Sequence, residues 1–146
     1  MQLPTQITTV AHVIQLAVAP VFLLTGVGAI LAVLVNRLGR VVDRFRTLER
    51  ALPVDDAAHK AADLLEMSKL EKRARLIHWA IGLCTGCALM VCIVIATLFV
   101  GSLTGTDISG PIATLFIIAM LSLVSGLLCF LREIALATGN IHISRR

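Results

Sequence analysis

The chain has 146 residues, of which 58% are hydrophobic and 15% are charged, and its mean hydropathy is +0.92. A soluble domain carries roughly 45–50% apolar residues and about 25% charged ones. Aromatic residues make up only 4% of the chain, so the apolar excess is aliphatic. The composition excludes an ordinary soluble domain and indicates an integral membrane protein.

Three apolar runs are each long enough to cross a membrane as a helix. They cover residues 11–35, 79–100 and 111–131, and none of them contains Asp, Glu, Lys or Arg. About 20 apolar residues are needed to cross roughly 30 Å of hydrocarbon. The first run has no basic residue ahead of it and no clear cleavage site, so it predicts a retained span and not a signal peptide.

The basic residues predict the orientation of these spans. All thirteen Lys and Arg residues lie between the first and second runs or after the third, and residues 1–10 and 101–110 have none. Because Lys and Arg concentrate on cytoplasmic segments, we expect an outer N-terminus and a cytoplasmic C-terminus in a bacterial inner membrane. Topology thus accounts for the net charge of +4, and no nucleic-acid partner is expected.

Residues 36–78 predict a cytoplasmic helical hairpin between the first two spans. One apolar stripe follows the first span at steps of three and four residues: Leu38, Val41, Val42, Phe45, Leu48 and Leu52. Pro53 would end that helix, and Asp55 or Asp56 would cap the next one. The second arm would face the first through a second stripe: Ala61, Leu64, Leu65, Ser68 and Lys72. The expected fold is a single all-α membrane domain over residues 1–146, with three spans and this hairpin.

A charged motif begins where the first span ends. It comprises six residues: Asn36, Arg37, Arg40, Asp43, Arg44 and Arg46. Arg37 and Arg40 would reach the lipid head groups, and Asp43 would pair with Arg40 or Arg46 along the helix, as Glu49 would with Arg46. The motif is interpreted either as a membrane anchor with a solvated charged face or as a surface that binds a partner.

The third span carries a small and weakly polar stripe that ends at an acid. Its candidate pore-lining or ion-binding residues are Ser122, Ser125, Cys129 and Glu133. We expect Glu133 to lie at the cytoplasmic boundary without deep burial, where an ion pair with Arg37 or Arg40 is the alternative to an ion site. Small residues that let membrane helices approach closely are the second feature of the spans: Gly82, Gly86 and Gly126, with Thr25, Gly28, Ala29 and Ala32 on the first span.

Cys84 and Cys87 form a C-x-x-C pair near the start of the second span. No βαβ pattern surrounds them and no set of further ligands is evident, so structural packing is favoured over a metal or redox role. The sequence shows no nucleophile–base–acid set, phosphate loop or HExxH motif. We therefore expect no enzymatic activity, no cofactor and no metal.

Residues 20–49, "PVFLLTGVGAILAVLVNRLGRVVDRFRTLE", resemble the signature of a family of small bacterial inner-membrane proteins of unknown function. The matching pattern is a Pro-led apolar span followed by N-R-L-x-R-[IV]-V-D-R-x-R-x-L. The segment "LREIALA" at residues 131–137 is similar to the end of that family's third span. The resemblance implies a three-pass helical membrane protein and implies no reaction.

These features lead to two functional hypotheses. The first is a non-enzymatic homo-oligomer in the inner membrane, most concretely a small ion channel or pore, because small packing faces accompany charges at the cytoplasmic mouth. The alternative is a membrane scaffold or accessory subunit that docks a cytoplasmic or membrane protein through its basic hairpin. The expected partners are the lipid bilayer, further copies of the chain and, in the alternative, that protein.

Overall fold

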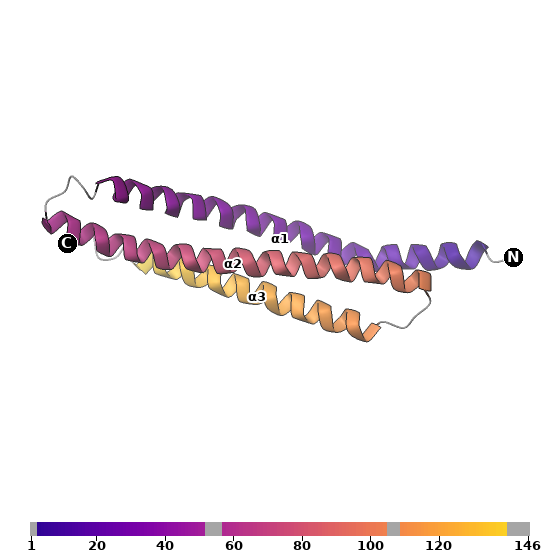
Figure 1. The fold of residues 1–146 in the computed structure, drawn as a ribbon. Coiled ribbons are helices and arrows are strands. Elements are labelled where there is room, and N and C mark those ends of the chain that lie inside the picture. Colours follow the sequence, from indigo (N-terminus) through magenta and orange to yellow (C-terminus); the bar gives the residue numbers. More distant parts are fainter. Residues whose placement is uncertain (1–2, 52–56, 105–108, 140–146) are drawn as a thin grey trace. The chain divides into compact units, whose positions relative to one another are not determined.

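The computed structural model describes residues 3–51, 57–104 and 109–139, which form three helices (Figure 1). These are α1 (Leu3–Ala51), α2 (Ala57–Thr104) and α3 (Ser109–Gly139). The described part of the chain is all-α, and each of the three helices is long and apolar enough to cross a membrane. The fold is that of a multi-pass membrane protein, as the composition predicts.

Helices α1 and α2 are both much longer than a membrane span. At 1.5 Å per residue, the 49 residues of α1 extend roughly 74 Å, more than twice the hydrocarbon thickness of about 30 Å. The predicted continuation of the first span as an unbroken helix is confirmed, and α1 also runs through Pro20 without interruption. Each of these two helices therefore combines a span with a polar extension.

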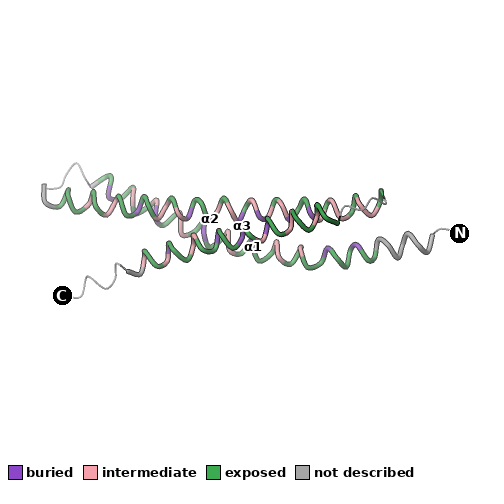
Figure 2. Tube along the Cα trace, turned by 90° about the horizontal axis from the view of Figure 1, so that it is seen from below, coloured by how far each residue is buried: buried purple, intermediate pink, exposed green. Residues whose placement is uncertain are grey.

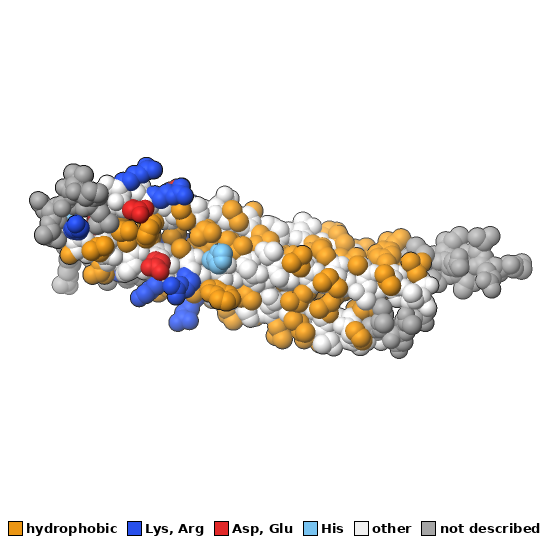
Figure 3. Space-filling view, viewed as in Figure 1, with side chains coloured by type: hydrophobic (Ala, Val, Ile, Leu, Met, Phe, Trp, Pro, Cys, Tyr) orange, Lys and Arg blue, Asp and Glu red, His pale blue; other side chains and the backbone are white. Residues whose placement is uncertain are grey.

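The chain clusters into two compact units, and every helix contributes to both. The described residues of unit 1 are 3–30, 83–104 and 109–124, and those of unit 2 are 31–51, 57–82 and 125–139. No Asp, Glu, Lys or Arg lies among the described residues of unit 1, so every described charge belongs to unit 2. Figure 3 shows the charged side chains of the visible face in blue and red.

Within each helix, buried residues recur every seven positions. Figure 2 marks the buried residues in purple along the chain. The series are Val27, Leu34, Val41 and Leu48 in α1, Leu70, Ile77, Cys84 and Val91 in α2, and Ala119, Gly126 and Glu133 in α3. A seven-residue repeat is typical of helices that pack side by side at shallow angles. The predicted stripe of α1 belongs to this pattern, since Val41 and Leu48 are buried and Leu38, Val42 and Phe45 are half-buried.

The predicted packing stripe of the second hairpin arm is wrong. Its five members are all exposed: Ala61, Leu64, Leu65, Ser68 and Lys72. The inward side of α2 in unit 2 instead combines buried Leu70 and Ile77 with half-buried Asp63, Glu66 and Arg73. The prediction sought apolar residues, whereas charged residues with partners in the fold occupy this side.

Two boundaries differ from the sequence-based expectation. The outer loop predicted at residues 101–110 is shorter, because α2 continues to Thr104 and α3 begins at Ser109. The predicted hairpin tip lies outside the described residues. So do Leu52, the last residue of the predicted α1 stripe, and the expected stop and cap residues: Pro53, Asp55 and Asp56.

Candidate functional site

Glu133 is the centre of a charged cluster in unit 2. Its side chain is fully buried, with 0% of its surface exposed. Arg73 of α2 donates two hydrogen bonds to its Oε1 atom, from Nε at 3.1 Å and from Nη2 at 2.8 Å. Burial of a carboxylate requires a paired charge and hydrogen bonds, and Arg73 supplies both. The expectation that Glu133 avoids deep burial is wrong, because the arginine compensates for the lost hydration.

Arg37 of α1 completes the cluster from a second helix. Its Nη2 atom lies 3.5 Å from Oε2 of Glu133, which accepts no hydrogen bond from any described residue. The guanidinium of Arg37 also lies over the ring of Phe130, 5.3 Å from the ring centroid, within cation–π range. The pairing of Glu133 with Arg37 is confirmed, and one carboxylate thereby ties α1 and α2 to α3 in this unit.

Arg44 and Glu66 connect the two arms of the hairpin farther from the spans. Nε of Arg44 donates a hydrogen bond of 2.9 Å to Oε1 of Glu66. This hydrogen bond and the charge of Glu66 raise the pKa of Arg44 above its ordinary value, and the charge of Asp63 adds to the effect. Arg44 of α1 is therefore joined to α2 by an exposed ion pair.

These arginines surround a small hollow, which we call the arginine cleft. The cleft has a volume of about 310 Å³ and is lined by Arg37, Arg40, Val41, Arg44, Leu70 and Arg73. Its walls come from α1 and α2 within unit 2. Four of its six lining residues are arginines, so the chemistry of the cleft suits an anion.

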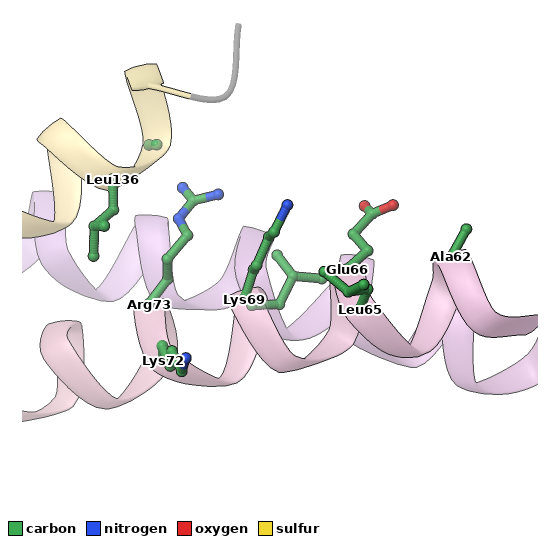
Figure 4. A pocket seen from close by; sticks show the side chains of 9 residues that line it. Ala62, Leu65, Glu66, Lys69, Lys72, Arg73 and Leu136 are labelled. Atoms are coloured by element: carbon green, nitrogen blue, oxygen red, sulfur yellow. The ribbon is translucent and has the colours of Figure 1, made fainter. Parts of the chain in front are cut away.

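A larger groove of about 700 Å³ lies along α2. Lys69, Arg73 and Glu66 rise from one side of the helix toward it, with Leu136 of α3 beside them (Figure 4). Leu70 and Arg73 line both this groove and the arginine cleft. Arg73 thus links the buried carboxylate to two accessible basic surfaces.

The rest of the predicted charged motif lies on the surface of α1. Asn36, Arg40, Asp43 and Arg46 are exposed. Asp43 and Glu49 form no ion pair within the described part of the chain, so the predicted pairs of Asp43 with Arg40 or Arg46, and of Glu49 with Arg46, are wrong. Exposed neighbours on one helix gain little from pairing, because water already solvates both charges.

The predicted pore-lining residues of α3 do not share one environment. In unit 1 the hydroxyl of half-buried Ser122 donates a 2.9 Å hydrogen bond to the carbonyl of Leu83. In unit 2 Ser125 is exposed, Cys129 is half-buried and Glu133 is buried. Ser122 and Glu133 are therefore engaged in contacts inside their own chain.

The predicted small residues and cysteines also lie in different environments. A Cβ atom added at Gly86 would lie 3.9 Å from Oγ of Ser122, whereas one at exposed Gly82 would meet nothing within 4 Å. Gly126 is buried. Cys84 and Cys87 are free, fully buried thiols in the packed side of α2. Among the described residues, no three His, Cys, Asp or Glu side chains are grouped to hold a metal ion.

A family model described as "Protein of unknown function (DUF2721)" matches residues 17–143. The chain belongs to this family. The match includes all of the residues that build the charged cluster and the arginine cleft, from Arg37 to Glu133. No curated protein and no solved structure matches the chain. Membership in the DUF2721 family agrees with the resemblance seen in the sequence and assigns no activity.

Sequence reasoning missed Arg73, the principal partner of Glu133. A usable signal was nevertheless present, because Arg73 precedes the buried residues Ala80, Cys87 and Val94 at steps of seven. Extending the seven-residue repeat of the span into the polar arm would have placed Arg73 on the packed side of α2.

Proposed function

We propose that this DUF2721 protein is a non-enzymatic membrane scaffold or accessory subunit that docks an acidic protein segment. The observation that carries the proposal is a row of polar side chains on the extension of α1, which we call the α1 outer face: Asn36, Asp43, Arg46 and Arg50. Arg46 and Arg50 are exposed and have no ion-pair partner within the described ranges. A rigid helix with unpaired arginines offers a preformed site for carboxylates.

The proposed setting is a bacterial inner membrane with the hairpin and the C-terminus in the cytoplasm. Its support is the distribution of Lys and Arg, which lie on the hairpin and after the third apolar run. In spheroplasts, a membrane-impermeant maleimide should leave a Ser68→Cys variant unlabelled and label a Leu103→Cys variant. Both positions are exposed. Inverted vesicles should give the opposite pattern, and labelling of position 68 in spheroplasts would reverse the proposed orientation.

Self-association into a channel or pore is the second candidate. The observation in its favour is the exposure of four small residues on α1: Thr25, Gly28, Ala29 and Ala32. In the most apolar 18-residue stretch of each helix, only 11% to 22% is buried inside the chain. Wide faces of the three helices are therefore left for lipid or other helices. The channel has less support than the scaffold, because Ser122 and Glu133 already have partners inside the chain.

Site-specific photo-crosslinking in cells separates the two candidates. A photoreactive residue at Thr47, beside Arg46 and exposed, should trap a different protein, giving an adduct whose mass is not a multiple of 15.6 kDa. Arg46→Glu with Arg50→Glu should reduce this adduct at least tenfold, because the partner's carboxylates would meet like charges.

The matched control is Arg75→Glu, which reverses another exposed arginine on the other arm and should leave the adduct unchanged. A photoreactive residue at Ala29 reports on self-association. Adducts only at multiples of the chain mass from both positions would reject the scaffold and favour the homo-oligomer. A heterologous adduct that survives both charge reversals would reject the α1 outer face as the docking surface.

A further inference from the structure

The arginine cleft holds more positive charge than its surroundings neutralise. Four guanidinium groups line it, and three carboxylates act on them: Glu133 on Arg37 and Arg73, and Glu66 with Asp63 on Arg44. All four arginines are accessible. Arg40 and Arg44 are exposed, and 24% of the side chain of Arg37 and 26% of that of Arg73 are exposed. A surplus of positive charge therefore faces an accessible hollow.

Arg40 is the member of the cleft that is free to bind a ligand. It is exposed and has no ion-pair or hydrogen-bond partner in the part of the chain that the structure describes. A guanidinium presents a planar fork of donors that matches two oxygens of a phosphate group. Arg37, Arg44 and Arg73 are held by their carboxylates around it, so much of the ordering cost of a binding site is already met by the fold.

We propose that the arginine cleft binds the phosphate group of an anionic membrane lipid. Arg40 lies five residues beyond Val35, the end of the first apolar run, which is about 8 Å along the helix. The head-group layer extends about 5–8 Å beyond the hydrocarbon on each side. Arg40 is therefore at the level of lipid phosphates, and basic pockets between membrane helices are known to bind anionic head groups.

The size and the remaining walls of the cleft agree with this ligand. A volume of about 310 Å³ is at the lower end of the range for ligand sites, roughly 300–1,000 Å³, and suits one head group. Val41 and Leu70 provide apolar wall beside the arginines, which suits the carbons next to a phosphodiester. A free phosphate ion is also an anion with phosphate oxygens, so an experiment has to distinguish the two sources.

The inference is independent of the proposed docking function. The cleft uses Arg37, Arg40, Arg44 and Arg73, whereas the α1 outer face uses Arg46 and Arg50. Loss of the partner adduct would leave phosphate binding intact, and loss of phosphate binding would leave the adduct intact.

Native mass spectrometry of the full chain in mild detergent tests the inference. Added phosphatidylglycerol should bind the wild-type chain at least tenfold more tightly than added phosphatidylcholine, because the zwitterionic lipid carries no net negative charge. Arg40→Gln should weaken phosphatidylglycerol binding at least fivefold. Arg40→Lys should be intermediate, because lysine keeps the charge and loses the planar fork. The Arg46→Gln variant, which changes another exposed arginine outside the cleft, should bind as wild type.

Inorganic phosphate, titrated into the same sample while the thermal unfolding midpoint is measured, distinguishes the sources. Stabilisation by phosphatidylglycerol but not by millimolar phosphate supports the lipid head group. If phosphate alone stabilised the chain, and Arg40→Gln abolished this stabilisation, the cleft would bind a phosphate group but not that of a lipid. The proposed lipid ligand would then be overturned. Equal binding of the two lipids, or equal effects of Arg40→Gln and Arg46→Gln, would overturn the site.

Discussion

Replacement of Glu133 with glutamine is expected to lower the free energy of unfolding by about 3 kcal/mol. Removing one partner of a buried ion pair typically costs about 3–5 kcal/mol, because the remaining charge is left uncompensated. Here the remaining charges are Arg73 and Arg37, which keep about a quarter of their side-chain surface exposed. Partial solvation of these two arginines places the cost at the lower end of the range.

The arrangement around Glu133 also predicts an order among its partners. Arg73→Gln should cost more than Arg37→Gln, because Arg73 donates two hydrogen bonds and Arg37 makes a 3.5 Å ion pair without one. Both should cost less than Glu133→Gln, since each leaves one arginine to neutralise the carboxylate. The measurement is unfolding of the purified chain by titration with a denaturing detergent.

Two further variants make the Glu133 prediction decisive. The double variant Arg73→Gln with Glu133→Gln should be more stable than Glu133→Gln alone, because it removes a charge that has lost its partner. Arg75→Gln removes an exposed arginine whose one ion pair among the described residues is with Glu71. It should change stability by less than about 0.5 kcal/mol. If Glu133→Gln unfolded with the same free energy as wild type, the buried cluster would not exist in solution.

The parts of the fold that could be predicted from the sequence are those in which apolar residues contact lipid or other apolar residues. The three helices and the stripe of α1 follow from composition and periodicity alone, as Val41 and Leu48 illustrate. The arm of α2 was placed on the wrong side because Glu66 and Arg73 count as polar in any periodicity argument. Their partners, Arg44 and Glu133, lie 22 and 60 residues away in the chain.

The candidate site was therefore only half predictable. A motif rich in arginine was evident, and the pairing of Arg37 with Glu133 follows from their common place at the end of a span. The arginine cleft was not evident, because it requires the register of α1 against α2. That register is set by the packing of Leu34, Ile77 and similar residues, and one sequence does not determine which of several registers packs best.

Ile77 provides the second strong prediction, because it tests that register directly. Its side chain is fully buried in unit 2, with 0% exposed, in the same seven-residue series as Leu70. Ile77→Ala should lower the free energy of unfolding by about 2–5 kcal/mol, through lost contacts and the cavity left behind. The same change at Ile93, also in α2 but 53% exposed, should cost less than about 1 kcal/mol.

The two substitutions are matched in chemistry, because both replace isoleucine with alanine in α2. They differ in the burial of the side chain inside the chain, which is complete at Ile77 and partial at Ile93. Leu70, one helical repeat before Ile77, also lines the arginine cleft. Looser packing around Ile77 in the Ile77→Ala variant should therefore weaken phosphatidylglycerol binding as well, whereas Ile93→Ala should not. Equal costs at the two positions would mean that α2 presents a different side to its neighbours, and the cleft built on that side would not form.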